Sequence, residues 1–132
     1  MPIETSLLIS ASPLKTQSHL TALRFVEELI NQKVTVRSIF FYQDAVLVAN
    51  QFNLPPSDEP LIREFWKKLS AQHGIELQTC IAASLRRGII DNQQANEQKI
   101  ENGNLDPAFI ITGLGQLAAA MSNKKIKLIH FK

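Results

Sequence analysis

The hydrophobic pattern alternates between two periods along the chain. Short apolar runs rich in β-branched and aromatic residues predict strands, and an almost continuous apolar run is typical of a strand buried on both faces. The first has Leu7-Leu8-Ile9 at its centre and the second reads VTVRSIFF. The strands predicted in this way cover residues 3–11, 34–41, 75–81 and 126–131, with a further short candidate at 109–111.

Between these runs the apolar positions recur at helical spacing. Leu20, Leu23, Val26 and Ile30 form one such stripe, and the helix that carries it begins near residue 16. Thr16 or Ser18 is a candidate N-terminal cap for this helix, Pro60 suits the first position of a second helix, and Gly74 suits its left-handed end. Helices are thus predicted from residue 16, at 60–73, at 82–87 and 91–102 and within 106–122, with a helical turn or two at 44–50.

Strands that alternate with helices are joined by right-handed βαβ crossovers. The predicted fold class is therefore α/β, a single-domain, open and mainly parallel sheet with helices on both faces, of the flavodoxin-like kind. We expect one domain over residues 1–132. Sheets of this kind carry their functional sites at the carboxyl ends of the strands.

Composition narrows the class of protein. Residues are 45% hydrophobic and 20% charged, with a formal net charge of +2, which suits a globular core and excludes a disordered chain. The segment MPIETSLLIS lacks the basic and apolar regions of a signal peptide, and no apolar run reaches the length of a membrane helix. We therefore expect a cytoplasmic protein with no membrane association. A single cysteine excludes an internal disulfide.

That cysteine, Cys80, lies at the carboxyl end of the third predicted strand and directly before a short helical segment. Helix N-termini present unpaired backbone N–H groups that stabilise a thiolate, and a persulfide would gain from the same groups. Partial exposure would allow the sulfur to be handed over. Arg86 and Arg87 follow within about two helical turns. Position alone leaves a second interpretation open, in which Cys80 is a small apolar residue that fills the core.

Other candidates are weaker. His19, His73 and His130 are far apart without metal-ligand spacing, and each is interpreted as structural. The Gly113–Gly115 segment is too short for a dinucleotide or phosphate loop, so neither a cofactor nor a metal is expected. The basic cluster at residues 124–127 is too narrow for direct nucleic-acid binding.

Four stretches of the chain resemble the DsrE/TusD family of sulfur-relay proteins. The most specific is the Cys-x-Ala-Ala-x-Leu-Arg-Arg-Gly run that begins at Cys80. The matching stretches are FFYQDAVLVANQ at 40–51, PSDEP at 56–60, AQHGIELQTCIAASLRRGI at 71–89 and ITGLGQLAAAM at 111–121. The segment 91–106 matches poorly, and the loop Ala11–Lys15 lacks the glycine that is frequent in the family, so its part in the site is open.

The resemblance implies a sulfurtransferase subunit that carries sulfane sulfur as a persulfide on Cys80. It implies an upstream persulfide donor, assembly with two related small subunits (TusB-like and TusC-like) in a heterohexamer, and a downstream TusE-like acceptor. The sulfur would serve 2-thiolation of the tRNA wobble uridine or, in the DsrE branch, dissimilatory sulfur oxidation. The proline-rich loop Pro55–Pro60 is a candidate contact for a protein partner because its prolines reduce the entropy lost on binding.

Two other functions compete with this one. A non-catalytic interaction subunit of the same assembly would need no thiol, and the presence of Cys80 within the family motif argues against it. A flavodoxin-like nucleotide or flavin binder would carry a serine- and glycine-rich loop after the first strand, and the loop Ala11–Lys15 does not have that composition.

Overall fold

The computed structural model describes residues 3–132, so Met1 and Pro2 of the N-terminal segment lie outside the described residues. Five strands form one sheet, and every strand pair is parallel. The strand order is β4-β3-β2-β1-β5. The strands are β1 (Glu4–Ile9), β2 (Val36–Phe41), β3 (Glu76–Cys80), β4 (Phe109–Thr112) and β5 (Ile126–Phe131).

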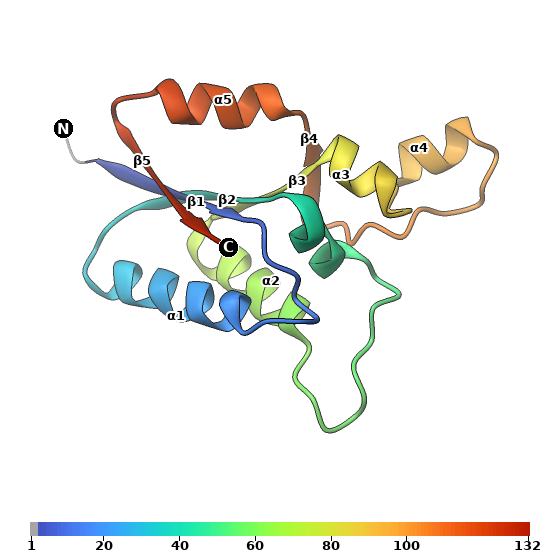
Figure 1. Ribbon diagram of the computed structural model, residues 1–132, viewed down its shortest axis with the longest axis horizontal. Helices are drawn as coiled ribbons and strands as arrows, with labels where there is room; N and C mark the ends of the chain where they lie inside the picture. Colours follow the sequence, from blue (N-terminus) through green and yellow to red (C-terminus); the bar gives the residue numbers. More distant parts are fainter. Residues whose placement is uncertain (1–2) are drawn as a thin grey trace.

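The predicted α/β class, with helices on both faces of a parallel sheet, is confirmed. Helices α1 and α2 lie on one face, and α5 lies on the other (Figure 1). Two short helices, α3 and α4, connect β3 to β4. The helical elements are α1 (Ser18–Asn31), the 3₁₀ helix η1 (Gln43–Ala49), α2 (Ile62–His73), α3 (Ile81–Arg86), α4 (Asn92–Glu97) and α5 (Leu114–Ser122).

The main core lies between the sheet and the layer formed by α1 and α2. Leu7, Ile9, Ile39 and Phe41 are completely buried there, and α2 adds the completely buried Trp66. Aromatic contacts join the sheet to α2, since the rings of Phe41 and Trp66 lie 5.4 Å apart, and extend across the sheet from Phe41 to Phe109, at 5.6 Å. The apolar centres of β1 and β2 are thus covered on one face of the sheet by α1 and α2.

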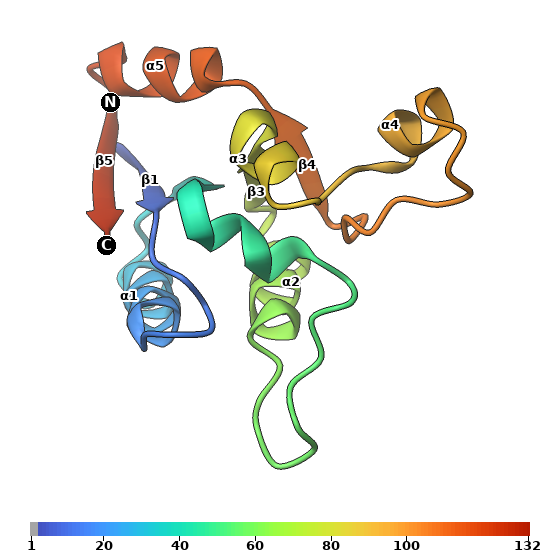
Figure 2. The same cartoon turned by 45° about the vertical axis from the view of Figure 1, so that its right-hand side comes forward.

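The opposite face is covered less completely. Every residue of α5 retains solvent exposure, and Leu114 and Met121 are 47% and 65% exposed. The helix packs mainly against β5, at one side of the sheet (Figure 2). This face of the molecule is therefore thinly covered in the isolated chain.

Most predicted elements form, but several ends differ. Helix α2 begins at Ile62 instead of Pro60, because Leu61 is still extended (φ −89°, ψ 98°). Gly74 ends it in the left-handed conformation predicted (φ 66°). The helix predicted over 91–102 is shorter, Asn92–Glu97, and Asp91 and Gln94 form a capping box at its start.

The caps predicted for α1 were wrong. Gln17 occupies the N-cap position and makes no side-chain cap hydrogen bond. The Thr16 hydroxyl lies one residue before this position, where it donates to the Ser12 carbonyl and accepts the N–H of Ser18, the first residue of α1, at 3.3 Å. The Ser18 hydroxyl donates to the Lys132 carbonyl and so joins α1 to the end of the chain.

Candidate functional site

Cys80 lies at the carboxyl end of β3, as the sequence predicts. It is the last residue of the strand and the N-cap of α3, with an extended backbone (φ −66°, ψ 126°). Its register partner in the neighbouring strand is Thr112, the last residue of β4. The cysteine and the threonine therefore stand side by side where two parallel strands end.

The side chain of Cys80 lies on the face of the sheet that carries α5. Side chains alternate along a strand, so Cys80 shares its face with Gln78 and not with Leu77. Gln78 borders a pocket with Gln116 and Ala119 of α5. Cys80 itself belongs to the buried hydrophobic cluster, as the interpretation of a core-filling residue expects. Register partners in a parallel pair point to the same face, which places the side chain of Thr112 on this side as well.

The thiol is a free cysteine and is buried, with 1% of the residue exposed. The expectation of partial exposure was wrong for the isolated chain. Helix α3 packs against both η1 and β3, and Ala83 and Ser84 of α3 are buried with Cys80. The packing of α3 onto η1 is a tertiary contact, which the local pattern around the cysteine did not reveal.

Two buried hydroxyl groups beside Cys80 have no hydrogen-bond partner. The Oγ1 atom of Thr112 and the Oγ atom of Ser84 are both shielded from solvent without donating or accepting a hydrogen bond. Thr112 is 6% exposed and Ser84 is fully buried. Ser84 lies one helical turn beyond Cys80, on the same side of α3. Sequence reasoning did not identify either residue, because nothing in the local sequence indicates an unpaired hydroxyl.

Arg87 links α3 to η1. Its Nε and Nη2 atoms each lie 3.0 Å from Oδ1 of Asp44, and its Nη1 atom donates to the Ala83 carbonyl at 3.0 Å. Arg86 is exposed at the end of the helix. Arg87 thus helps to hold α3 against η1, and its guanidinium is engaged by Asp44 and Ala83.

The loop after β1, Ala11–Lys15, is fixed by a buried histidine. The Nε2 atom of His19 lies 2.8 Å from the Ala11 carbonyl, and Trp66 donates its indole N–H to Nδ1 at 3.1 Å. The carbonyl accepts only, so Nε2 carries the proton and the ring is neutral. Burial lowers the pKa of His19 to about 4. His19 is therefore structural, as the sequence predicts.

The other two histidines lie apart from it and from each other. His73 is the last residue of α2, and His130 on β5 pairs with the Ser10 hydroxyl at 2.8 Å. Among the described residues 3–132, no group of three His, Cys, Asp or Glu side chains is placed to hold a metal ion.

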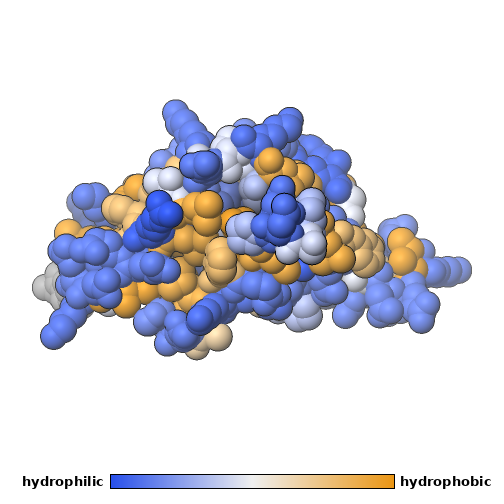
Figure 3. All heavy atoms as spheres, turned by 90° about the horizontal axis from the view of Figure 1, so that it is seen from below, coloured by the Kyte–Doolittle hydropathy of each residue, from blue (hydrophilic) through white to orange (hydrophobic). Residues whose placement is uncertain are grey.

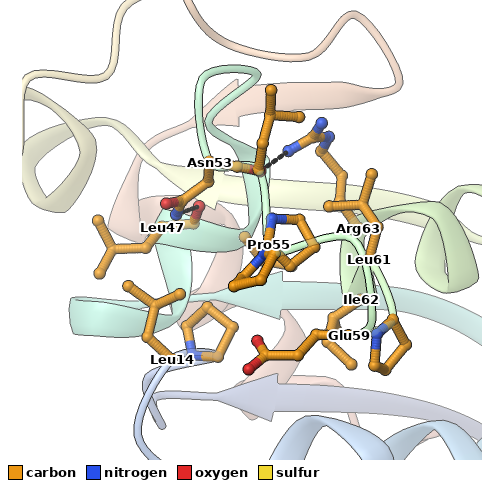
Figure 4. A pocket seen from close by; sticks show the side chains of 13 residues that line it. Leu14, Leu47, Asn53, Pro55, Glu59, Leu61, Ile62 and Arg63 are labelled. Carbon is orange, nitrogen blue, oxygen red and sulfur yellow. Dashed lines mark hydrogen bonds between the residues drawn. The ribbon is translucent and has the colours of Figure 1, made fainter.

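A pocket of about 220 Å³ opens where the loop after β1 meets the proline-rich loop (Figure 4). Leu14, Leu47, Pro55 and Ile62 give it apolar walls. Figure 3 shows that the side carrying α1 and α2 also exposes apolar side chains among charged ones. Cys80 does not line this pocket.

A buried ion-pair network, missed from the sequence, holds the base of the proline-rich loop. Arg63 donates to the carbonyls of Asn50 and Asn53 and lies 3.4 Å from Asp106. Asp106 also binds Lys67 at 2.9 Å, and this hydrogen bond raises the pKa of Lys67 above its ordinary value.

None of the described helices, which begin after residue 3, is long and apolar enough to cross a membrane.

Comparison with known proteins places this arrangement in a family. The DsrE/DsrF-like family model matches residues 5–131. The chain is 40% identical over 125 residues to "Sulfurtransferase TusD" of Serratia proteamaculans (strain 568), covering 94% of this chain and 97% of that protein. It is also 40% identical over 115 residues to "Sulfurtransferase TusD" of Salmonella typhi, covering 87% and 90%.

Among solved structures, the YchN protein from E. coli has the same fold. The TM-score is 0.72 at 20% sequence identity, and the match covers 99% of this chain and all of that one. The relatives named above confirm the predicted class of activity, sulfur transfer. By its sequence over residues 5–131, the chain belongs to the DsrE/DsrF-like family.

Proposed function

We propose that Cys80 carries sulfane sulfur as a persulfide and passes it to the thiol of an acceptor protein. One observation carries the proposal: the chain has a single cysteine, and it stands at the carboxyl end of β3, where parallel α/β sheets place their sites. A sulfurtransferase that uses a cysteine persulfide has no other residue here to carry it.

Loading needs a donor persulfide and no redox partner. The Cys80 thiolate attacks the outer sulfur of R–S–SH, the S–Sγ bond forms, and the donor S–S bond breaks. The electron pair of the broken bond leaves with the donor as R–S⁻. The product, Cys80–S–SH, loses its proton to solvent.

Handover repeats the same chemistry in reverse order. The thiolate of the acceptor attacks the terminal sulfur of Cys80–S–SH, and the bond to Sγ breaks with its electron pair retained by Cys80. The buried thiol must become accessible for both steps, because Cys80 is 1% exposed. Displacement of α3 is the motion that would expose it, since α3 begins directly after the cysteine.

The pathway and partners follow the same proposal. The similarity to proteins named TusD favours a relay in the cytoplasm that ends in 2-thiolation of the tRNA wobble uridine. In this relay the chain assembles with two related small subunits as a heterohexamer and delivers sulfur to a TusE-like acceptor. A DsrE-type role in sulfur oxidation is the alternative, and it would use Cys80 in the same way.

Intact mass spectrometry tests the proposal. Incubation with a persulfide-loaded cysteine desulfurase should add one sulfur atom to the chain, and a thiol reductant should remove it. Cys80→Ser should gain none, whereas Thr5→Val, at the amino end of β1, keeps the cysteine and should still gain sulfur. Equal gain by wild type and Cys80→Ser would refute Cys80 as the carrier.

A further inference from the structure

We infer that the hydroxyl groups of Thr112 and Ser84 form a binding site for the terminal sulfur of the Cys80 persulfide. The inference rests on the proposed function, which places a second sulfur on Cys80. It goes beyond that function because it assigns two residues that hold the transferred atom itself. Neither hydroxyl has a hydrogen-bond partner in the unloaded chain.

Buried polar groups without partners are rare, because each forfeits the hydrogen bonds that water would make with it. Three buried side-chain atoms in the described chain lack a hydrogen-bond partner. The third, Nε of Arg63, lies 3.4 Å from the Asp106 carboxylate, which compensates its charge. The two hydroxyl groups have no such compensation, and they belong to the register partner of Cys80 and to the residue four positions after it.

The geometry places both donors around Cys80 from different elements. Thr112 is the register partner of Cys80, on the neighbouring strand and the same face of the sheet. Ser84 lies four residues further along α3, which the cysteine caps. Cys80 therefore has one of these residues beside it on β4 and the other one helical turn further along α3.

The strand register and the missing hydrogen bonds suit a persulfide better than a thiol. Adjacent strands lie about 4.8 Å apart, so a hydroxyl on β4 faces the cysteine across one inter-strand gap. Neither hydroxyl is hydrogen-bonded to Sγ. A second sulfur lengthens the Cys80 side chain by about 2 Å, which would extend its reach beyond Sγ toward the neighbouring groups.

The terminal sulfur of the persulfide and the two hydroxyl groups are complementary as hydrogen-bond acceptor and donors. The terminal sulfur of a persulfide is anionic once its proton has left, and hydroxyl groups are donors that can rotate toward it. A hydrogen bond to a charged acceptor is stronger than one between neutral groups. The hydroxyl groups of Thr112 and Ser84 would thus stabilise the protein that carries the persulfide, and they contribute no hydrogen bond to the protein without it.

The test is the equilibrium constant for sulfur exchange between Cys80 and a low-molecular-weight persulfide, measured by intact mass. Thr112→Val keeps the shape of the side chain and removes the hydroxyl. We expect it to lower the constant about tenfold, and Ser84→Ala to act in the same direction. Thr112→Ser restores the donor and should recover most of the loss.

Thr5→Val is the matched control. Thr5 is buried, 4% exposed, near the amino end of β1, so the same chemical change is made far from the thiol. Thermal unfolding of the unloaded protein supplies a second readout. Thr112→Val should be as stable as wild type or more stable, because no hydrogen bond is lost in the unloaded state.

The outcomes separate the two proposals. Wild-type protein that gains no sulfur overturns the proposed function and this inference together. Normal loading of wild type with unchanged exchange constants in Thr112→Val and Ser84→Ala overturns the inference alone. An equal loss in Thr5→Val, or no recovery in Thr112→Ser, also overturns it.

Discussion

Cys80 and Thr112 are register partners at the ends of β3 and β4, and their side chains lie on one face of the sheet. This relationship joins the single thiol to a buried hydroxyl that has no other partner. It also places the thiol at the side of the sheet that α5 covers thinly, and beneath the first turn of α3. The burial of Cys80 is consequently a property of how α3 is held.

The first prediction concerns access to the thiol. Because Cys80 is 1% exposed, its alkylation in the native protein should be at least about 100-fold slower than in denaturant, equivalent to an opening free energy of about 3 kcal/mol. Asp44→Asn weakens the contact between Arg87 and η1 and should raise the native rate about fivefold, near 1 kcal/mol for a partly exposed ion pair. Labelling followed over time by mass spectrometry measures both rates.

Glu4→Gln is the control for this experiment. It removes the exposed pair between Glu4 and Arg37 at 3.7 Å, at the opposite end of the sheet, and should leave the labelling rate unchanged. A native rate equal to the denatured rate would contradict the burial of the thiol. An unchanged rate in Asp44→Asn would show that Arg87 does not hold α3 closed.

The second prediction concerns pH and stability. His19 is neutral when folded, and burial lowers its pKa from 6.5 to about 4. Between these two values the unfolded chain binds the extra proton, so stability is intact above pH 6.5 and falls as the pH drops toward 4. The loss from this group approaches about 3 kcal/mol.

Urea denaturation at a series of pH values measures that loss. His19→Gln should flatten the dependence between pH 6.5 and 4, while lowering stability at pH 7 because the bonds to Ala11 and Trp66 are altered. His73 is exposed at the end of α2, and His73→Gln serves as the control that keeps the wild-type slope. A His19→Gln slope equal to that of wild type would contradict the assignment.

The fold was largely predictable because its signals are local. Residues 126–131 form β5 as predicted, and Gly74 takes the left-handed turn that its position indicated. The prediction of Ser18 as the cap of α1 failed because its hydroxyl donates to the carbonyl of Lys132, an acceptor that only the folded chain brings close. Local propensity thus located the elements, and tertiary contacts decided their ends.

The site was predictable to the extent that it follows from topology. Cys80 became a candidate from its place at the end of a parallel strand, and the resemblance of the run that begins there to the DsrE/TusD family favoured it over a core-filling residue. Its neighbour Thr112 depends on the register between β3 and β4, and Ser84 depends on the packing of α3 against η1. Neither relationship can be predicted from the spacing of residues along the chain.

The third prediction tests the ion-pair network below the proline-rich loop. Asp106 is 4% exposed and Arg63 is 6% exposed, so Asp106→Asn leaves a buried guanidinium without its counter-charge. We expect a loss of about 3 kcal/mol in the free energy of unfolding. The same variant should increase proteolysis of the loop Pro55–Pro60, because Arg63 anchors the carbonyls at its base.

Glu64→Gln is the matched control in the same network. It removes the exposed partner of Lys67, at 3.5 Å, and should cost less than about 0.5 kcal/mol. Chemical denaturation of the two variants under identical conditions compares them directly. Equal stabilities of Asp106→Asn and wild type would show that the buried carboxylate is dispensable.

The last prediction concerns assembly. Helix α5 has no buried residue, and Leu114 and Met121 are 47% and 65% exposed on it, although single-domain proteins in solution rarely leave an apolar helix so open. We expect the purified chain to self-associate and to form a complex near six chains when co-expressed with its two related subunits. Leu114→Lys should weaken that complex at least tenfold, whereas Gln72→Lys on α2 adds the same charge to an exposed position and should leave it intact.

Light scattering coupled to size-exclusion chromatography measures the mass of each mixture. A monomer that ignores both subunits at micromolar concentration would overturn the heterohexamer, and full assembly of Leu114→Lys would remove α5 from the interface. Partner binding adds stability by mass action, so the complex should also unfold at a higher temperature than the chain alone.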